Sequence, residues 1–148
     1  MSRMLGLVLM VCLLTGCGTN TFEVPYPIAV GKLIEAYPTT DPDNAARYAD
    51  LPAYSNEGGG TPWELTATHE ETVPGQLYVI TIHKDWKFIN PRTTTFTIRN
   101  VGDARCTVEV LSRRKMAVGS MRDRGYENVR MMEVKDVLKL PDNPMFRD

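Results

Sequence analysis

The sequence predicts an α+β fold, in which an antiparallel sheet of about four strands is covered by an N-terminal and a C-terminal helix. Two observations lead to this prediction. Between residues 63 and 112, apolar side chains recur at every second position, which is typical of strands with one buried face. On either side of that stretch, residues 27–37 and 127–140 carry apolar side chains at helical spacing. Helices on both flanks of a strand-rich centre favour a sheet with one covered and one wet face.

The first 16 residues have the organisation of a signal peptide. Arg3 and the amino terminus supply positive charge, and Leu5–Leu14 form the apolar run. Ten residues of helix reach about 15 Å, roughly half the hydrocarbon thickness of a bilayer, so the run is too short to span one. Three alternatives are an ordinary secretory signal cut elsewhere, a buried helix of the mature fold and a short membrane insertion. An ordinary signal favours Ala-x-Ala-like cleavage, and the first alanine is Ala29.

Residues 13–19 read Leu-Leu-Thr-Gly-Cys-Gly-Thr and close the apolar run with small residues and a cysteine. This motif resembles the lipobox of bacterial lipoproteins. The resemblance implies that a dedicated signal peptidase cuts before Cys17, that the Cys17 sulfur carries diacylglycerol, and that the new amino terminus is acylated, typically with palmitate. Each buried methylene contributes about 0.8 kcal/mol, so two or three acyl chains hold a protein far more firmly than one. We therefore expect Cys17 to be the site of lipid attachment.

The motif also sets the expected organisation and location of the chain. We divide it into a signal peptide over residues 1–16, a lipidated tether over residues 17–26, and a single α+β domain over residues 27–148. Gly18 follows the modified cysteine, whereas an aspartate there resembles the inner-membrane retention signal of enteric lipoproteins. In a host with two membranes, we therefore expect attachment to the outer membrane, facing the periplasm.

Composition narrows the classes of partner. Without residues 1–16, which hold one basic and no acidic side chain, the chain keeps 132 residues with 16 basic and 18 acidic side chains. This length fits one domain, and the near-neutral balance gives no support to nucleic-acid binding. With Cys17 lipidated, Cys106 would be the one remaining thiol, which excludes an intramolecular disulfide. Its phase with Val108 and Val110 indicates a small buried residue more than a reactive or metal-binding thiol.

The first predicted element of the domain is an amphipathic helix over residues 27–37. Pro27 suits a first turn, Pro38 stops the helix, and Gly31 weakens it. The run Ile28–Val30 would also suit a strand. The apolar residues at helical spacing are Val30, Leu33, Ile34 and Tyr37. Asp41 and Pro42 form a cap and first-turn pair, which predicts a short second helix over residues 42–50.

Residues 52–62 are predicted to form an exposed loop. They contain two prolines and the run Gly58–Gly60. A phosphate-binding loop would need a lysine followed by serine or threonine after the glycines, whereas Thr61, Pro62 and Trp63 follow here. We therefore interpret the glycine run as a flexible linker.

Four alternating runs predict the strands of the sheet. They start at Trp63, Tyr78, Thr95 and Cys106, and the turn signals are Pro74-Gly75 and Asn100–Asp103. The side chains expected on the buried face of these strands are Leu65, Ile80, Ile82, Phe96, Ile98, Val108 and Val110.

The C-terminal part of the chain combines a helix with a group of basic residues. Residues 127–140 carry a loose apolar stripe that ends before Pro141, which predicts a helix over the sheet. The basic residues before it are Arg113, Arg114, Lys115, Arg122 and Arg124. They indicate either contact with an anion, such as lipid headgroups or a cell-wall polymer, or a solvated loop whose charge is diluted by nearby acids.

Catalytic chemistry has weak support. His69 and His83 lack a second metal ligand at a recognised spacing, and no hydroxyl lies in a Gly-x-Ser-x-Gly motif. The candidate hydroxyl nucleophiles are Thr93, Thr94, Thr95, Ser112 and Ser120, and strand propensity explains the threonines. The aromatic residues Trp63, Trp86, Tyr78 and Phe88 suit either a sugar-stacking or partner surface or the core.

These observations favour a lipid-anchored, non-enzymatic cell-envelope protein that acts as an interaction or structural module. Its expected partners are the membrane, through the acyl chains on Cys17, and an envelope protein or cell-wall polymer; we expect no catalytic residue, metal, cofactor or nucleic acid. One alternative is an envelope enzyme, which would join His69 or His83 to an acid and a nucleophile within about 3 Å. Another is a carrier of a small apolar ligand, which would need an enclosed apolar cavity between helix and sheet.

Overall fold

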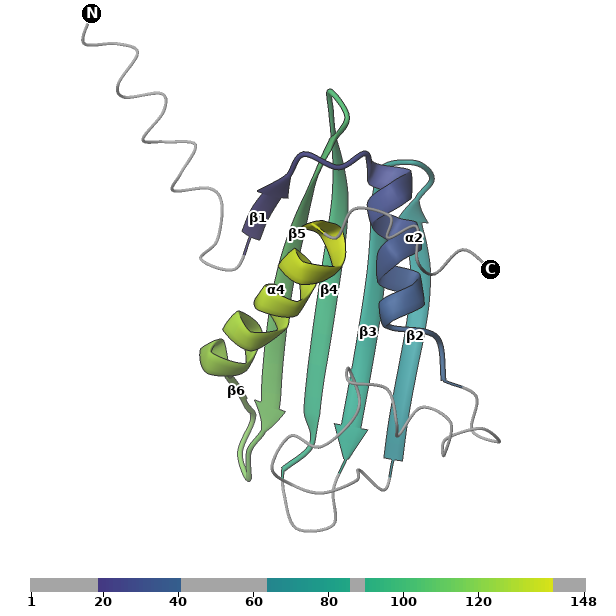
Figure 1. The fold of residues 1–148 in the computed structure, drawn as a ribbon. Coiled ribbons are helices and arrows are strands. Elements are labelled where there is room, and N and C mark those ends of the chain that lie inside the picture. The colour runs from purple at the N-terminus through teal and green to yellow at the C-terminus, as the bar shows by residue number, and fades with distance from the viewer. Residues whose placement is uncertain (1–18, 41–63, 86–89, 140–148) are drawn as a thin grey trace, which may run out of the picture.

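The computed structural model describes residues 19–40, 64–85 and 90–139 (Figure 1). Cys17, the predicted helix 42–50, the predicted loop 52–62, and Trp63, Trp86 and Phe88 lie outside the described residues. The elements are, in chain order, β1 (Thr19–Phe22), α2 (Tyr26–Ala36), β2 (Glu64–Val73), β3 (Leu77–Asp85), β4 (Arg92–Gly102), β5 (Arg105–Lys115), β6 (Ser120–Arg122) and α4 (Arg124–Lys139).

The strands form one antiparallel sheet in the order β1-β5-β4-β3-β2, and β6 also pairs with β5. Because β4 occupies one edge of β5, β1 and β6 share the other edge, opposite residues 106–109 and 113–115 respectively. The predicted α+β class is confirmed, whereas the sheet formed by the described residues has six strands in place of about four. The hairpin between β4 and β5 turns at Asp103 and Ala104, which both have positive φ, as a two-residue type I′ turn requires.

Strand β1 differs from the predicted division of the chain, which assigned residues 17–26 to a tether. Thr19 pairs with Glu109 and Phe22 with Cys106, and Phe22 is only 7% exposed, in the core. The short polar sequence Thr-Asn-Thr gives no strand signal of its own. Its pairing with β5 satisfies backbone groups that β5 would otherwise leave open at that edge.

Both helices lie on the same face of the sheet, and α2 also contacts α4 (Figure 1). Helix α2 begins at Tyr26, one residue before the predicted start, and the Tyr37 N–H donates to the Leu33 carbonyl at its end. Helix α4 begins at Arg124, earlier than the predicted residue 127. The earlier start follows from Asp123, whose Oδ1 accepts the Tyr126 N–H at 3.1 Å as an N-cap does.

The core fills the space between this sheet face and the helices. The register aligns Ile80, Phe96 and Val110 in one row across the three central strands. Six of the seven predicted strand positions are buried, and Leu65 is half-buried. The core residues are Phe22, Tyr26, Ala29, Leu33, Tyr37, Ala67, Ile80, Ile82, Phe96, Ile98, Cys106, Val108, Val110, Met131, Val134 and Leu138.

Beyond the apolar rows, the same sheet face carries a row of three basic side chains, which we call the basic row: Lys84, Arg92 and Arg114. Lys84 is 2% exposed and Arg92 is 8% exposed. The Asp123 carboxylate neutralises part of this charge, because its Oδ2 lies 3.0 Å from Arg92 Nη2 and 3.3 Å from Arg114 Nη2. Asp123 therefore caps α4 and binds two strands of the sheet with the same side chain.

We expect Asp123→Asn to lower the free energy of unfolding by about 3 kcal/mol, because it leaves buried guanidinium charge without its carboxylate. Asparagine caps a helix as well as aspartate does, so the variant removes the charge and keeps the cap. Asp103→Asn is the matched control, since Asp103 is largely exposed in its 3.6 Å pair with Arg105 and should change stability by less than about 0.5 kcal/mol. Urea denaturation measures both; equal effects would contradict this role of Asp123.

Candidate functional site

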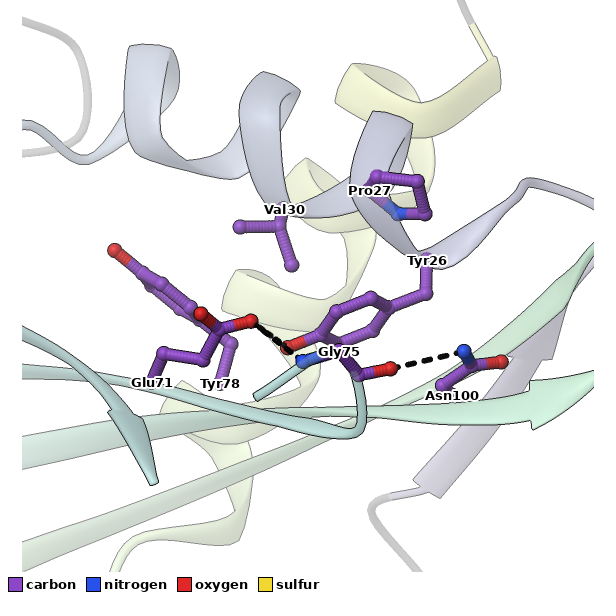
Figure 2. Close-up of a pocket in the computed structure, with 7 residues that line it drawn as sticks. All are labelled: Tyr26, Pro27, Val30, Glu71, Gly75, Tyr78 and Asn100. Atoms are coloured by element: carbon purple, nitrogen blue, oxygen red, sulfur yellow. Dashed lines mark hydrogen bonds between the residues drawn. The ribbon is translucent and has the colours of Figure 1, made fainter. Parts of the chain in front are cut away.

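A pocket of about 430 Å³ lies where the first turn of α2 meets the hairpin of β2 and β3. Figure 2 shows its side chains, with the Glu71 carboxylate between the rings of Tyr26 and Tyr78 and with Val30 on the helix above. The lining residues are Tyr26, Pro27, Val30, Glu71, Gly75, Tyr78 and Asn100.

Local sequence and sheet register place these groups. Tyr26 is the first residue of α2. Glu71 pairs directly with Tyr78, so the side chains of Glu71 and Tyr78 lie on the same, helix-covered face of the sheet. Gly75 adopts φ +67°, which the turn requires, and its N–H donates to Glu71 Oε1 at 2.9 Å. Asn100 holds the turn from β4, because its Nδ2 donates to the Gly75 carbonyl at 3.0 Å.

The carboxylate and the phenols shape the electrostatics of the pocket. Burial, and then the negative charge of Glu71, raise the pKa of Tyr26 to about 12, and the same two causes raise the pKa of Tyr78. Both phenols are therefore protonated at neutral pH, and the Tyr26 hydroxyl donates to Glu71 Oε1 at 3.3 Å. Within the described residues, Glu71 Oε2 accepts no hydrogen bond. The pocket thus offers one carboxylate oxygen and two aromatic rings to a ligand.

Only part of this site could be predicted from the sequence. Tyr78 was among the aromatic candidates for a partner surface. Asn100 was predicted only as part of a turn, and Tyr26 and Glu71 were not predicted as site residues. Tyr26 and Glu71 lie 45 residues apart, and only the packing of α2 on the sheet brings them together. The available signal was the proline on each side of Tyr26 and the Pro74-Gly75 turn after Glu71.

The two histidines lie on opposite faces of the sheet. His69 faces the helices, and its Nε2 donates to the Tyr37 carbonyl at 2.6 Å; burial lowers the pKa of His69, and this hydrogen bond partly opposes the shift. His83 lies on the uncovered face, where its Nδ1 is 3.0 Å from Thr93 Oγ1. In the described part of the chain, no carboxylate lies within hydrogen-bond distance of His83. Within the described residues, His83 and Thr93 therefore provide a base and a hydroxyl, but no acid that would orient the base.

The other predicted candidates are placed separately. Cys106 is fully buried, and burial raises the pKa of its thiol to about 11, in agreement with the prediction of a packed cysteine. Thr94 and Ser112 hydroxyls pair at 3.1 Å in the buried layer, while Ser120 is exposed. Among the described residues, no group of three or more His, Cys, Asp or Glu side chains is arranged to hold a metal ion.

A second cluster of ionisable groups covers the basic row under α4. The Tyr126 ring contacts two guanidinium groups, with its centroid 3.9 Å from Arg92 Cζ and 4.7 Å from Arg130 Cζ. Arg130 Nη1 donates to Glu133 Oε2 at 2.6 Å, and the Tyr37 hydroxyl donates to the same oxygen at 3.0 Å. These contacts join α2, the sheet and α4, which gives the cluster a structural role.

Comparison with known proteins finds no matching protein family, curated protein or solved structure. Within the described ranges, neither α2 nor α4 combines the length and the apolar character needed to cross a bilayer.

We expect stability to rise with pH between about 8 and 10 through Lys84. Burial and the positive charge of Arg92 lower the pKa of Lys84 to about 8, while Glu133 opposes the shift. In this range the unfolded chain still holds the proton that the folded protein releases, so a higher pH favours the folded state. The measurement is urea denaturation of the wild type and of Lys84→Met at pH 8 and pH 9.5. Cys106 titrates in both proteins, so the difference between them isolates Lys84; equal pH dependence would contradict the shift.

Proposed function

We propose that this protein is a lipid-anchored, non-enzymatic envelope protein that acts as an interaction module. The observation that carries the proposal is the distance in sequence between the lipobox-like motif and the fold. Strand β1 begins at Thr19, so Gly18 alone would separate the acylated Cys17 from the sheet. Such an anchor would hold the domain directly at the membrane surface, which raises its effective concentration toward partners at that surface. We further propose the outer membrane, facing the periplasm, in a host with two membranes.

The pocket beside α2 supports a binding role and suggests the chemistry of the bound group. Tyrosine rings attract cations through their faces, and the Glu71 carboxylate adds a negative charge between the two rings. An amine or guanidinium is therefore the group that the pocket fits best. We propose that it receives a basic side chain of an envelope partner.

Two other functions have less support. The contact between His83 and Thr93 is the observation that favours an envelope enzyme, and a carboxylate on His83 Nε2 would complete the site expected for one. A carrier of an apolar ligand would need an enclosed apolar cavity, whereas the pocket described here contains a carboxylate, two phenols and an amide.

We expect Cys17→Ala to abolish lipidation and processing, because the sulfur that forms the thioether is gone. In wild-type cells, mass spectrometry of the mature amino terminus should show a diacylglyceryl-modified Cys17 and no residues 1–16. Fractionation should place the wild type with outer-membrane markers where two membranes exist. A membrane-bound wild-type protein with unmodified Cys17 and residues 1–16 retained would defeat the anchor.

We expect Glu71→Gln to abolish binding of a lysine probe, because it removes the charge that the pocket offers to an amine. Nα-acetyl-lysine amide should shift the NMR signals of the Asn100 side chain and the Gly75 amide in the mature protein, with millimolar affinity. The Nε-acetylated probe should cause no shift, since its charge is gone. Glu70→Gln is the matched control, because Glu70 is the exposed neighbour on the opposite face of β2. Equal binding by both variants would refute this role of the pocket.

A further inference from the structure

The exposed apolar side chains of this protein are concentrated in one segment. Among the described residues, eight large apolar side chains are exposed, and five of them lie between residues 116 and 132. Val118, at the turn between β5 and β6, is 93% exposed. The five are Met116, Val118, Met121, Val129 and Met132. Exposed apolar side chains that come from one segment make that segment a candidate contact site.

The charge exposed beside these side chains is positive. Residues 113–129 contain five basic and two acidic side chains. Both acids are already paired, since Asp123 binds Arg92 and Arg114 while Glu127 Oε1 lies 2.8 Å from Arg122 Nε. Three basic residues of the segment are exposed, namely Arg113, Lys115 and Arg124, and Arg113 reaches Ser120 Oγ at 3.5 Å across the hairpin. The register places Arg113 and Lys115 on the uncovered face of β5, whereas Arg124 begins α4 on the covered face. The cations therefore flank the β5–β6 edge from both faces, beside the apolar side chains of the hairpin.

The hairpin between β5 and β6 is held in a defined shape. The Met116 N–H donates to the Gly119 carbonyl at 3.0 Å, and the Lys115 N–H donates to the Pro91 carbonyl at 2.8 Å. Gly119 adopts φ +73°, which closes the turn. The turn that carries Val118 thus projects from a fixed base, so an inserted side chain there loses little conformational freedom.

This hairpin lies on the same edge of the sheet as β1, the first described element of the chain. Thr19 lies opposite Glu109 and Arg122 lies opposite Arg113, both on the same edge of β5, and four strand residues span about 13 Å. Figure 1 shows β1 and β6 along this one side of the sheet, with the first turn of α4 beside β6. A lipid on Cys17, two residues before Thr19, would bring a bilayer to the same side of the molecule.

We propose that the β5–β6 hairpin and the first turns of α4 form a membrane-contact surface for an anionic bilayer. Val118 enters the interface between headgroups and acyl chains, and Arg113, Lys115 and Arg124 approach lipid phosphates. Interfacial elements that combine apolar and basic side chains bind anionic membranes in this way. The inference rests on the proposed anchor at Cys17, which keeps the bilayer within reach and leaves the contact surface to orient the domain.

The test uses the mature lipidated protein in vesicles of phosphatidylcholine with phosphatidylglycerol. Val118→Cys carries an environment-sensitive fluorophore, and brominated lipids report its depth. Val73→Cys is the matched control, because Val73 is an exposed valine in the β2–β3 hairpin, away from β5 and β6. We expect a blue shift and quenching at position 118 and neither at position 73. Replacing the three cations by glutamine should reduce the quenching at position 118.

The outcomes separate the surface from the anchor. Flotation and mass spectrometry show directly whether Cys17 is lipidated. If it is not, the same depth measurement on the unlipidated protein with added vesicles still tests the hairpin. Absence of quenching at position 118, or equal quenching at position 73, would overturn the proposal. A fluorophore at position 118 that responds to a soluble anionic glycan polymer and not to vesicles would also overturn it.

Discussion

The carboxylate of Asp123 lies where three parts of the structure meet. Two arginines from neighbouring strands bind Asp123 Oδ2, and Asp123 Oδ1 caps α4. The backbone N–H of Asp123 donates to the Ser112 carbonyl of β5 at 2.9 Å. Lys84 and Arg92 could not remain buried on this sheet face without compensating groups above them. The first turns of α4 supply those groups, while the later turns cover apolar rows. One face of the sheet therefore buries apolar rows in one part and ion-paired basic side chains in another. The base of the β5–β6 hairpin depends on the ion-paired part.

Local patterns were sufficient to predict most of the sheet. Alternation located the four long strands β2 to β5 and six buried positions from Ile80 to Val110, because one-sided burial leaves a two-residue period in the sequence. The same reasoning placed Cys106 in the core. It missed β1, whose sequence is short and polar and whose pairing is decided by the edge of β5. The continuation of β5 from Arg113 to Lys115 was also missed, since a run of basic residues is typical of a solvated loop. Only the fold brings Asp123 to Arg114 on the covered face.

The candidate pocket was harder to predict because no single segment contains it. Tyr26 comes from α2, Glu71 and Tyr78 from paired strands, and Asn100 from β4, so its existence depends on how the helix packs on the sheet. Pairing of Glu71 with Tyr78 follows from the hairpin, but the approach of Tyr26 does not. The start of α4, by contrast, could have been predicted from local sequence. Asp123 is a residue type favoured at N-caps, and a search for caps would have placed the start correctly.

The proposed anchor and the proposed membrane-contact surface share one edge of β5, whereas the pocket lies by the β2–β3 hairpin, across the sheet from β6. A domain held by that edge would direct the pocket away from the bilayer, toward partners in the envelope. Hydrogen–deuterium exchange of the lipidated protein tests this orientation most directly. Compared with zwitterionic vesicles, anionic vesicles should slow exchange in peptides covering residues 113–122 and leave residues 71–78 unchanged. Unchanged exchange in residues 113–122, or slower exchange in residues 71–78, would contradict the orientation.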